Sequence, residues 1–581
     1  MKRNFIIIIF LVALALNIKA ADRRTLDMAA YLDTLSTSGD IYPAIASALE
    51  DCRKQKIRRL VFPKGEYSVR AERIPARLTH ITNNGSRERR FAFDLTGMDG
   101  LEVDGGGSTF VFSGFVCPFL IDHCSDIRIK GCDIDYSRTF HSEGRITGST
   151  DRSFDVIFPS EYPYEVVDNR LKFTDSEGRE YPWGYILELD PIKRETAYMV
   201  SDYGLMGEST PVQQLGDTVR IFASKIPVTV GNVMSFGALR RDVPAITVTD
   251  SKNIEIVNTT IYHCGAMGVI AQRSRDIALR HVDVIPNTAK GRIVSATADA
   301  THFANCAGKI TIDSCTFEGQ RDDATNIHGI YYRIRSIDSP REITVELAHK
   351  DQSGFDYLKP GMNIEVVKAG SLATIQRNRI KKKEQIDPST FRVTVAASLP
   401  DSLRIKDVIA GDDEYPDVAI RNCRFSSNRA RGLLIGSRGK VLIENCRFHN
   451  PGAAILFEGD ARFWFEQAGV RDVTIRNNVF DNCRFGVWGD AIIATGTGLD
   501  EKYLSSCRYN RNILIENNTF RIFSAPVLKM YVTSGLIFRN NKIITTTDYP
   551  SQREPKPDNL FQIIDCDSMD IENQTNSNLI K

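Results

Sequence analysis

Residues 418–425 (Val-Ala-Ile-Arg-Asn-Cys-Arg-Phe) decide the fold of this chain, because residues 441–448 (Val-Leu-Ile-Glu-Asn-Cys-Arg-Phe) repeat them 23 positions later. Apolar and polar residues alternate in both stretches, which predicts β-strands. Equivalent stretches begin at Ile127, Ile254, Ile277, Ile310, Val473, Ile513 and Leu536. A strand motif that recurs at a short interval is typical of a solenoid.

The spacing of the motif distinguishes between repeat architectures. Starts 254 and 277, and again 513 and 536, also lie 23 residues apart, whereas 277 and 310 lie 33 apart. A constant rung with occasional surface extensions predicts an all-β, right-handed parallel β-helix, and a propeller would need a period of about 40 to 50 residues. Asn in the Asn-Cys or Asn-Asn pair tolerates left-handed geometry, and its amide can bond the rung above.

The rest of the mature chain is interpreted around this coil. Residues 40–53 read as an amphipathic helix that caps its open end. Two stretches lack the rung motif but contain short alternating strands, and we interpret them as small β-barrel-like insertions rather than long irregular loops. The predicted division is 1–21 signal peptide, 22–137 cap and first rungs, 138–245 first insertion, 246–329 central rungs, 330–416 second insertion, and 417–581 C-terminal rungs and tail.

The N-terminus predicts export. Lys2 and Arg3 precede an apolar run at residues 5–16, and cleavage is expected after Ala20 or Ala21. The alternative, a membrane anchor, would need about 20 apolar residues. The signal peptide therefore indicates a periplasmic or secreted protein, with no membrane span.

Composition and cysteine placement narrow the function classes. A formal net charge of +1 gives no electrostatic case for nucleic acid as a partner. Four of the 12 cysteines occupy one equivalent place in the repeat, so an internal ladder is favoured over a disulfide framework, although some pairs could be bridged: Cys132, Cys315, Cys423 and Cys446.

Carboxylates repeat on two consecutive rungs. Residues 298–303 read Ala-Asp-Ala-Thr-His-Phe, and residues 321–328 read Arg-Asp-Asp-Ala-Thr-Asn-Ile-His. Asp299 and Asp323 are 24 residues apart, one rung, so they should lie side by side at about 4.8 Å spacing, with Asp322 one residue earlier. Like charges this close are unfavourable, so at least one carboxyl should carry a raised pKa, as glycosidases require.

Two other readings of this cluster are a calcium site and a solvated turn. Calcium prefers an all-oxygen shell, which His302 and His328 do not suit, so no metal and no cofactor are expected. Further candidates for sugar contacts are His302, Asn326, His328, Arg431, Glu458 and Trp488. Trp488 could equally be a stacked core aromatic and Arg431 a solvated charge, and the two histidines could simply bond backbone.

The Asp…Asp-Asp spacing and the Asn-Cys rungs resemble the polygalacturonase-like β-helix hydrolases. Over essentially the whole mature chain, and most specifically in residues 298–302 and 321–326, the sequence is similar to the glycoside hydrolase family 110 α-1,3-galactosidases of Bacteroides-type gut bacteria. This resemblance implies inverting, exo-acting hydrolysis of terminal α-1,3-linked galactose, from the branched blood-group B determinant and, in one subgroup, from linear structures. It also implies that Asp322 is the general acid and that Asp299 and Asp323 hold the attacking water.

One departure from the polygalacturonase pattern is the lack of an obvious basic pair, which favours a neutral sugar. Two rival functions remain at the level of sequence: a β-helix polysaccharide lyase, for which Arg321 is adjacent to the aspartates, and a non-enzymatic carbohydrate-binding solenoid. The sequence does not decide between branched and linear substrates. Exposed strands on the insertions would allow a homodimer.

Overall fold

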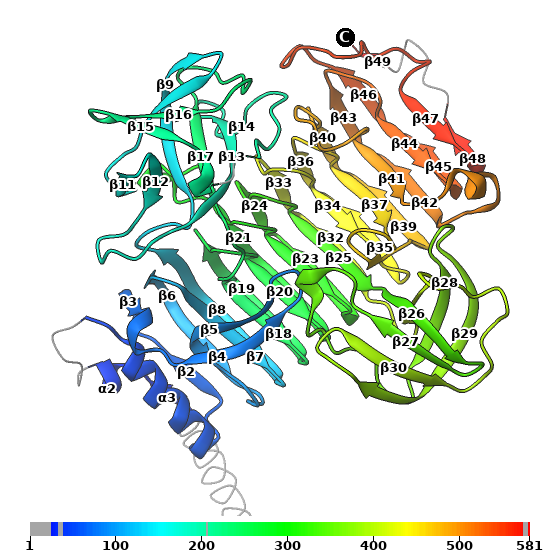
Figure 1. Cartoon of the computed structure of the whole chain (residues 1–581), viewed down its shortest axis with the longest axis horizontal. Coiled ribbons are helices and arrows are strands. Elements are labelled where there is room, and N and C mark those ends of the chain that lie inside the picture. The colour runs from blue at the N-terminus through cyan, green and yellow to red at the C-terminus, as the bar shows by residue number, and fades with distance from the viewer. Residues whose placement is uncertain (1–24, 33–38, 205–206, 573–578, 581) are drawn as a thin grey trace, which may run out of the picture.

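The computed structural model describes residues 25–32, 39–204, 207–572 and 579–580, so the predicted signal peptide lies outside the described residues. The chain winds into a long parallel coil, with one insertion on either side of it (Figure 1). Within the described ranges, no helix has both the length and the apolar character that crossing a membrane requires.

The repeated motif forms one continuous sheet whose register reproduces the sequence alignment. Ile254 pairs with Ile127 on one side and Ile277 on the other, and Ile310 pairs with Val418. The first insertion separates residues 127 and 254 and the second separates 310 and 418, so both leave the stack of rungs unbroken. The motif strands are β8 (Ser125–Tyr136), β19 (Lys252–Ile261), β21 (Arg275–Val284), β23 (Ala307–Asp313), β32 (Asp417–Arg421), β35 (Lys440–Glu444), β39 (Asp472–Arg476), β42 (Asn510–Glu516) and β45 (Thr533–Arg539).

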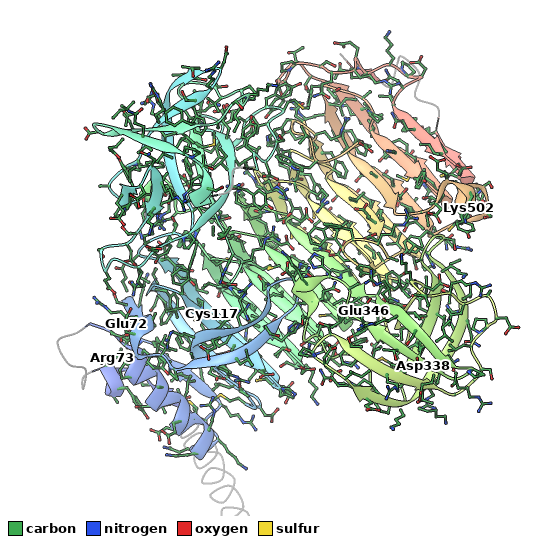
Figure 2. All side chains as sticks on the ribbon, viewed as in Figure 1. Glu72, Arg73, Cys117, Asp338, Glu346 and Lys502 are labelled. Atoms are coloured by element: carbon green, nitrogen blue, oxygen red, sulfur yellow. The ribbon has the colours of Figure 1, made fainter. Side chains whose placement is uncertain are left out.

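In the Asn-Cys and Asn-Asn bends, one residue of the pair adopts the left-handed geometry and the other bonds the neighbouring rung. The first residue of the pair adopts left-handed geometry, as at Asn477, where φ is 57°. The second carries the ladder of amides: Asn478 Nδ2 donates to Asn518 Oδ1 at 3.0 Å, and Asn518 Nδ2 donates to Asn541 Oδ1 at 2.9 Å. The sequence interpretation had assigned both tasks to one asparagine. The twelve cysteines, all within the described residues, are free thiols, and Cys117, which Figure 2 labels on the coil, is buried.

A second sheet of the coil carries the candidate site. Its strands run in the order β4 (Ala76–Ile81), β5 (Gly85–Asp94), β7 (Val116–Asp122), β18 (Ile246–Thr249), β20 (Val269–Gln272), β22 (Thr301–Ala304), β25 (Thr325–Ile330), β34 (Leu433–Ile435), β37 (Ile455–Gly459), β41 (Ile493–Thr497), β44 (Leu528–Tyr531) and β47 (Phe561–Ile564). The short strand β38 (Glu466–Gln467) pairs antiparallel with the end of β25.

The two insertions differ in how they close. The second is a closed barrel with its own apolar core, formed by β26 (Tyr332–Ser339), β27 (Glu342–Glu346), β28 (Asn363–Lys368), β29 (Ala373–Gln385), β30 (Thr390–Val395) and β31 (Val408–Gly411). The first is a seven-stranded antiparallel sheet whose core merges with that of the coil. Its strands are β9 (Ser142–Thr150), β10 (Ser153–Ile157), β13 (Trp183–Asp190), β14 (Glu195–Thr196), β15 (Val212–Leu215), β16 (Thr218–Phe222) and β17 (Val233–Ala238), accompanied by the hairpin β11 (Tyr164–Val167) and β12 (Arg170–Phe173).

The predicted capping helix is α3 (Tyr42–Gln55), which begins two residues later than expected. Ala44, Ile45, Ala48 and Leu49 face the coil and are buried. Their apolar side chains join the main core, so the helix covers side chains that have no rung below them.

Candidate functional site

The two aspartate rungs are adjacent. Thr301 on β22 pairs with Thr325 on β25, so Asp299 and Asp323 occupy equivalent positions just before these strands. The nearest carboxylate oxygens of Asp299, Asp322 and Asp323 all lie within 4.8 Å of one another. The three residues are only 4, 8 and 1% exposed, respectively, so their charges interact in a largely dry environment.

Successive side chains of β22 and β25 point to opposite faces of the sheet, so one face packs into the core and the other carries the site. Phe303 and Ile327 belong to the main core, so His302, Asn326 and His328 lie on the opposite face of the sheet. These three polar residues are nevertheless buried. Sequence reasoning missed two of the residues that contact them: Asn83, in the turn between β4 and β5, and Glu466, on β38.

Two arginines hold Asp322. Arg241, which follows the last strand of the first insertion, donates to Asp322 Oδ2 at 2.6 Å, and Arg429 donates to Asp322 Oδ1 at 3.1 Å. Arg429 also pairs with Asp202 of the first insertion. None of Arg241, Arg429 and Asp202 was identified from the sequence.

Asp323 and Asp299 have different partners. Arg431 binds both oxygens of Asp323, with Nε to Oδ1 and Nη2 to Oδ2 at 2.8 Å each. Among the described residues, no arginine bonds Asp299, whose Oδ2 instead lies 2.6 Å from His302 Nδ1. The candidate Arg431 is thus bound to a carboxylate rather than being a solvated charge.

These partners separate the pKa values of the three carboxyls. Burial and the charge of Asp322 raise the pKa of Asp299 well above its usual range. Burial raises the pKa of Asp323 to about 6, although Arg431 opposes the rise. Burial alone would also raise the pKa of Asp322, but Arg241, Arg429 and Arg431 outweigh it and lower this pKa to about 2.

Three of the sequence candidates lie around the cluster without touching it directly. Glu458 on β37 is close enough to Arg431 and Asp323 for their charges to affect its pKa, which burial raises. Trp488 is half-buried against the first insertion, and the Arg429 guanidinium lies 5.3 Å from its ring centre. Asn326 pairs with His302 in the strand register and has a buried Oδ1 without a hydrogen-bond partner.

The arginines correct one sequence interpretation. We had expected no basic pair beside the aspartates and favoured a neutral sugar on that ground, but Arg241, Arg429 and Arg431 converge there. Each of them is already bound to a carboxylate. Arg321, the adjacent cation that a lyase would use, is buried and donates to Ser235 on β17.

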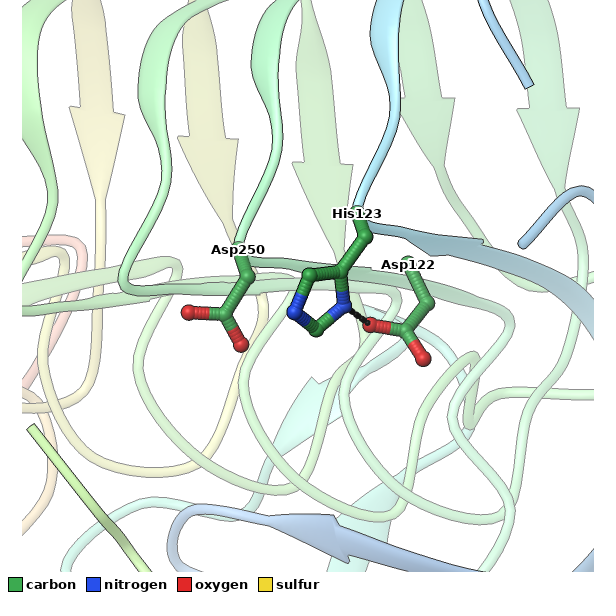
Figure 3. A group of neighbouring side chains, drawn as sticks. All are labelled: Asp122, His123 and Asp250. Carbon is green, nitrogen blue, oxygen red and sulfur yellow. Dashed lines mark hydrogen bonds and ion pairs between the residues drawn. The ribbon is translucent and has the colours of Figure 1, made fainter. Parts of the chain in front are cut away.

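A second group of carboxylates and imidazole lies on the same sheet, at the carboxyl ends of strands β7 and β18, whereas Asp299 and Asp323 precede their strands (Figure 3 shows the second group). His123 Nδ1 lies 2.6 Å from Asp122 Oδ1, and Asp250 sits beside the ring. Each carboxylate also has its own arginine: Arg77 donates to Asp122 at 2.5 Å and Arg273 to Asp250 at 2.7 Å. The His123 side chain is 70% exposed, whereas the side chains of Asp122 and Asp250 are 12 and 19% exposed, so solvent reaches this network of ion pairs through the imidazole.

Comparison with known proteins agrees with this architecture. Family models match the GLAA-B beta-barrel domain I at residues 142–234, the GLAA-B beta-barrel domain II at 342–409 and the right-handed beta-helix region at 408–578. The alpha-1,3-galactosidase A of Shewanella woodyi is 36% identical over 89% of this chain and 85% of its own length. The alpha-1,3-galactosidase B of Bacteroides thetaiotaomicron is 31% identical over 87% and 84%, respectively.

Among solved structures, the mannuronan C-5 epimerase AlgE4 A-module of Azotobacter vinelandii is similar with a TM-score of 0.39 and 11% identity, covering 90% of this chain and 97% of that one. This score is too low to bear on function. A parallel β-helix with a buried carboxylate cluster on its side is compatible with a β-helix glycoside hydrolase, and the relatives identify that class. The chain belongs to the alpha-1,3-galactosidase A/B family, to which the sequence resemblance had pointed.

Proposed function

We propose that this chain removes terminal, non-reducing α-1,3-linked galactose from glycans such as the blood-group B determinant, with inversion; linear α-1,3-galactosyl structures are the second candidate substrate. Asp322 acts as general acid, and Asp299 and Asp323 hold the attacking water. The names of its relatives, alpha-1,3-galactosidases A and B, support the choice of sugar. The observation that carries the proposal is the buried cluster of three carboxyls with separated pKa values.

The arginines favour water, rather than a carboxylate, as the nucleophile. Both oxygens of Asp322 accept from Arg241 and Arg429, and both oxygens of Asp323 accept from Arg431. A carboxylate engaged at both oxygens is a poor nucleophile, so attack by water and inversion are favoured over a glycosyl-enzyme intermediate.

The cluster is as tight as the one-rung spacing predicts, and tighter than the usual acid–base pair of an inverting enzyme. Its nearest oxygens lie within 4.8 Å, whereas acid and base in inverting glycosidases usually stand about 6.5–9.5 Å apart. We therefore expect the attacking water beside the cluster, within reach of Asp299 and Asp323, rather than between the acid and the base.

The acid role requires a proton that Asp322 lacks in the resting site. Arg241 and Arg429 keep this carboxyl ionised, while the neighbouring Asp299 has the raised pKa. We expect the galactoside, on binding, to break the ion pair between Arg241 and Asp322. The pKa of Asp322 then rises, and the proton held by Asp299 passes to it.

A leaving-group comparison tests these roles. Asp322→Asn should lower kcat/KM on a B-antigen trisaccharide by about 10³-fold, but far less on a nitrophenyl α-galactoside, whose leaving group needs little protonation. Asp323→Asn should lower both alike. If Asp322→Asn hydrolyses both substrates at the wild-type rate, the acid assignment is wrong.

The same substrates separate an enzyme from a binding protein. The wild type should release free galactose from the trisaccharide. Binding of the trisaccharide without any released galactose would instead identify a carbohydrate-binding solenoid.

We also propose that the protein is exported, with cleavage after Ala20 or Ala21. The charged start and apolar run of the sequence support this. The mass of the protein recovered from its host should lack the first 20 or 21 residues, and an intact N-terminus would contradict export by cleavage.

A further inference from the structure

An unbroken series of short polar contacts leads from the carboxylate cluster to a backbone carbonyl. Asp299 Oδ2 lies 2.6 Å from His302 Nδ1, and His302 Nε2 lies 2.9 Å from His328 Nε2. His328 Nδ1 lies 2.8 Å from the carbonyl oxygen of Gly329. All three side chains are at least nine-tenths buried, so bulk water does not mediate these contacts.

The carbonyl end of the series fixes where the hydrogens lie. A carbonyl oxygen only accepts, so His328 Nδ1 must carry the hydrogen of the last contact. A neutral imidazole has one N–H, which leaves His328 Nε2 as an acceptor. His302 Nε2 must then donate to His328, and His302 Nδ1 becomes the acceptor toward Asp299.

The first contact therefore needs a donor on Asp299. An ionised carboxylate cannot donate, so Asp299 must be protonated when both rings are neutral. The Asn83 amide nitrogen Nδ2 lies 3.2 Å from His302 Nε2. The arrangement requires the amide to be flipped, which exchanges its oxygen and nitrogen and turns the accepting oxygen toward this N–H.

Two other proton distributions conflict with the surroundings. With Asp299 ionised and both rings neutral, two nitrogen lone pairs would face each other at 2.9 Å. With the proton moved to His328, a buried imidazolium would form, and the nearest carboxylate oxygen that the described residues offer it, on Glu466, lies 3.6 Å away. Burial lowers the pKa of His302 to about 4 and lowers that of His328, which opposes this second distribution.

The charges that face Asp299 come from several elements. Asp322 and Glu466 disfavour its ionisation, while Arg241 and Arg431 favour it. The two arginines are each bound to another aspartate. The net field on Asp299 therefore does not oppose the arrangement that the hydrogen bonds require.

We propose that Asp299, His302 and His328 carry one proton beyond the single N–H of each neutral ring, and that this proton rests on Asp299, so that Asp299 enters the reaction neutral while Asp323 alone is the base. His302 and His328 are positioning residues that hold the carboxyl in its protonated form. This inference deepens the proposed function and rests on it, because it identifies the source of the proton that Asp322 delivers.

Nitrogen NMR on the unliganded full chain, labelled with ¹⁵N-histidine, tests the arrangement without reference to activity. The chain has 9 histidines, and replacing His302 and His328 one at a time assigns their signals. We expect neutral rings at pH 7, with His302 protonated on Nε2 and His328 on Nδ1. An Nδ1–H form of His302, or a doubly protonated His328, would overturn the proposal.

The pH profile of His302→Ala supplies a readout that a purely structural role would not move. The alkaline limb of kcat/KM reports loss of the Asp299 proton. Removing the acceptor of that proton should shift the limb to lower pH by roughly one unit. A limb that stays in place or moves to higher pH would mean that His302 stabilises an ionised Asp299, contrary to the proposal.

The exposed His281 supplies a matched control, and His281→Asn should leave the profile unchanged, since Asn tolerates the left-handed geometry found there. If the wild type releases no galactose, the proposed function fails, whereas the NMR result still decides the position of the proton.

Discussion

Two groups of carboxylates and imidazole lie on the same sheet of the coil, at opposite ends of its strands. Asp122 ends β7 and His123 follows it, and Asp250 follows β18, whereas Asp299 and Asp323 precede β22 and β25. Both groups bring their polar oxygens and nitrogens within 4.8 Å of one another. They differ in the exposure of the imidazole, which is 70% for the side chain of His123 and 1% for that of His302, and in the number of carboxyls without an arginine; we call them the exposed group and the buried group.

In the exposed group, each carboxylate is bound by its own arginine, and His123 reaches solvent. In the buried group, the only side chain among the described residues that bonds Asp299 is an imidazole, and the pKa of Asp299 is raised while that of Asp322 is lowered. Proximity of carboxyls therefore does not make a catalytic site. Burial combined with unequal pairing produces the separated pKa values that acid–base chemistry needs.

The largest contrast between the groups is expected from matched amide substitutions. Asp323→Asn removes the proposed base and should lower kcat/KM by about 10³-fold. Asp250→Asn makes the same chemical change in the exposed group and should leave kcat/KM within twofold. Equal losses in the two variants would show that the contrast between the groups is wrong.

The next largest difference is expected between variants that replace the arginine partner in each group. Arg431→Gln leaves Asp323 buried without its cation, so the free energy of unfolding should fall by about 3 kcal/mol. The pKa of Asp323 should also rise, so activity at pH 7 should drop about tenfold and the acidic limb should move to higher pH. Arg273→Gln should also destabilise the fold, as measured by urea unfolding, but should leave the pH profile unchanged.

The pH dependence of the wild type sharpens the comparison without any substitution. Asp323 must be ionised to accept a proton from water, and burial raises its pKa to about 6. Below pH 6, kcat/KM should therefore fall about tenfold per pH unit. In the exposed group, Arg273 outweighs burial and lowers the pKa of Asp250. If kcat/KM stays constant down to pH 4, the pKa of Asp323 is not raised, and the two groups do not differ in this respect.

The smallest effect is expected from metal removal. Arginine or histidine occupies each carboxyl of both groups, so neither has the free oxygen shell that calcium prefers. Dialysis against EDTA should leave both kcat/KM and the melting temperature unchanged. A loss of activity that added calcium restores would identify the buried group as a metal site.

Repeat spacing allowed the rungs and the central pair of aspartates to be predicted. In a coil, a period in the sequence becomes contact in space, so the offset between Asp299 and Asp323 translated directly into neighbouring positions. The same reasoning holds for Ile310 and Val418, which pair although the second insertion separates them.

The arginines and the other residues that surround the aspartates are brought there by tertiary contacts, which the repeat spacing does not predict. Arg241 and Asp202 come from the first insertion and Asn83 from an early turn, and none belongs to a repeated motif. Arg429 offered one local signal, because it lies two residues before the candidate Arg431. The pairing of Asp322 with arginines rather than with a proton depends on these contacts, so sequence alone could not supply it.

The stereochemistry of the first product tests the account most directly. Proton NMR during early hydrolysis of an α-1,3-linked galactobiose by the wild type should show β-galactose appearing before mutarotation produces the α-anomer. This result would mean that water attacks beside the arginine-bound carboxylates. Initial release of α-galactose would show that one of these carboxylates is itself the nucleophile, and would contradict the roles assigned to the buried cluster.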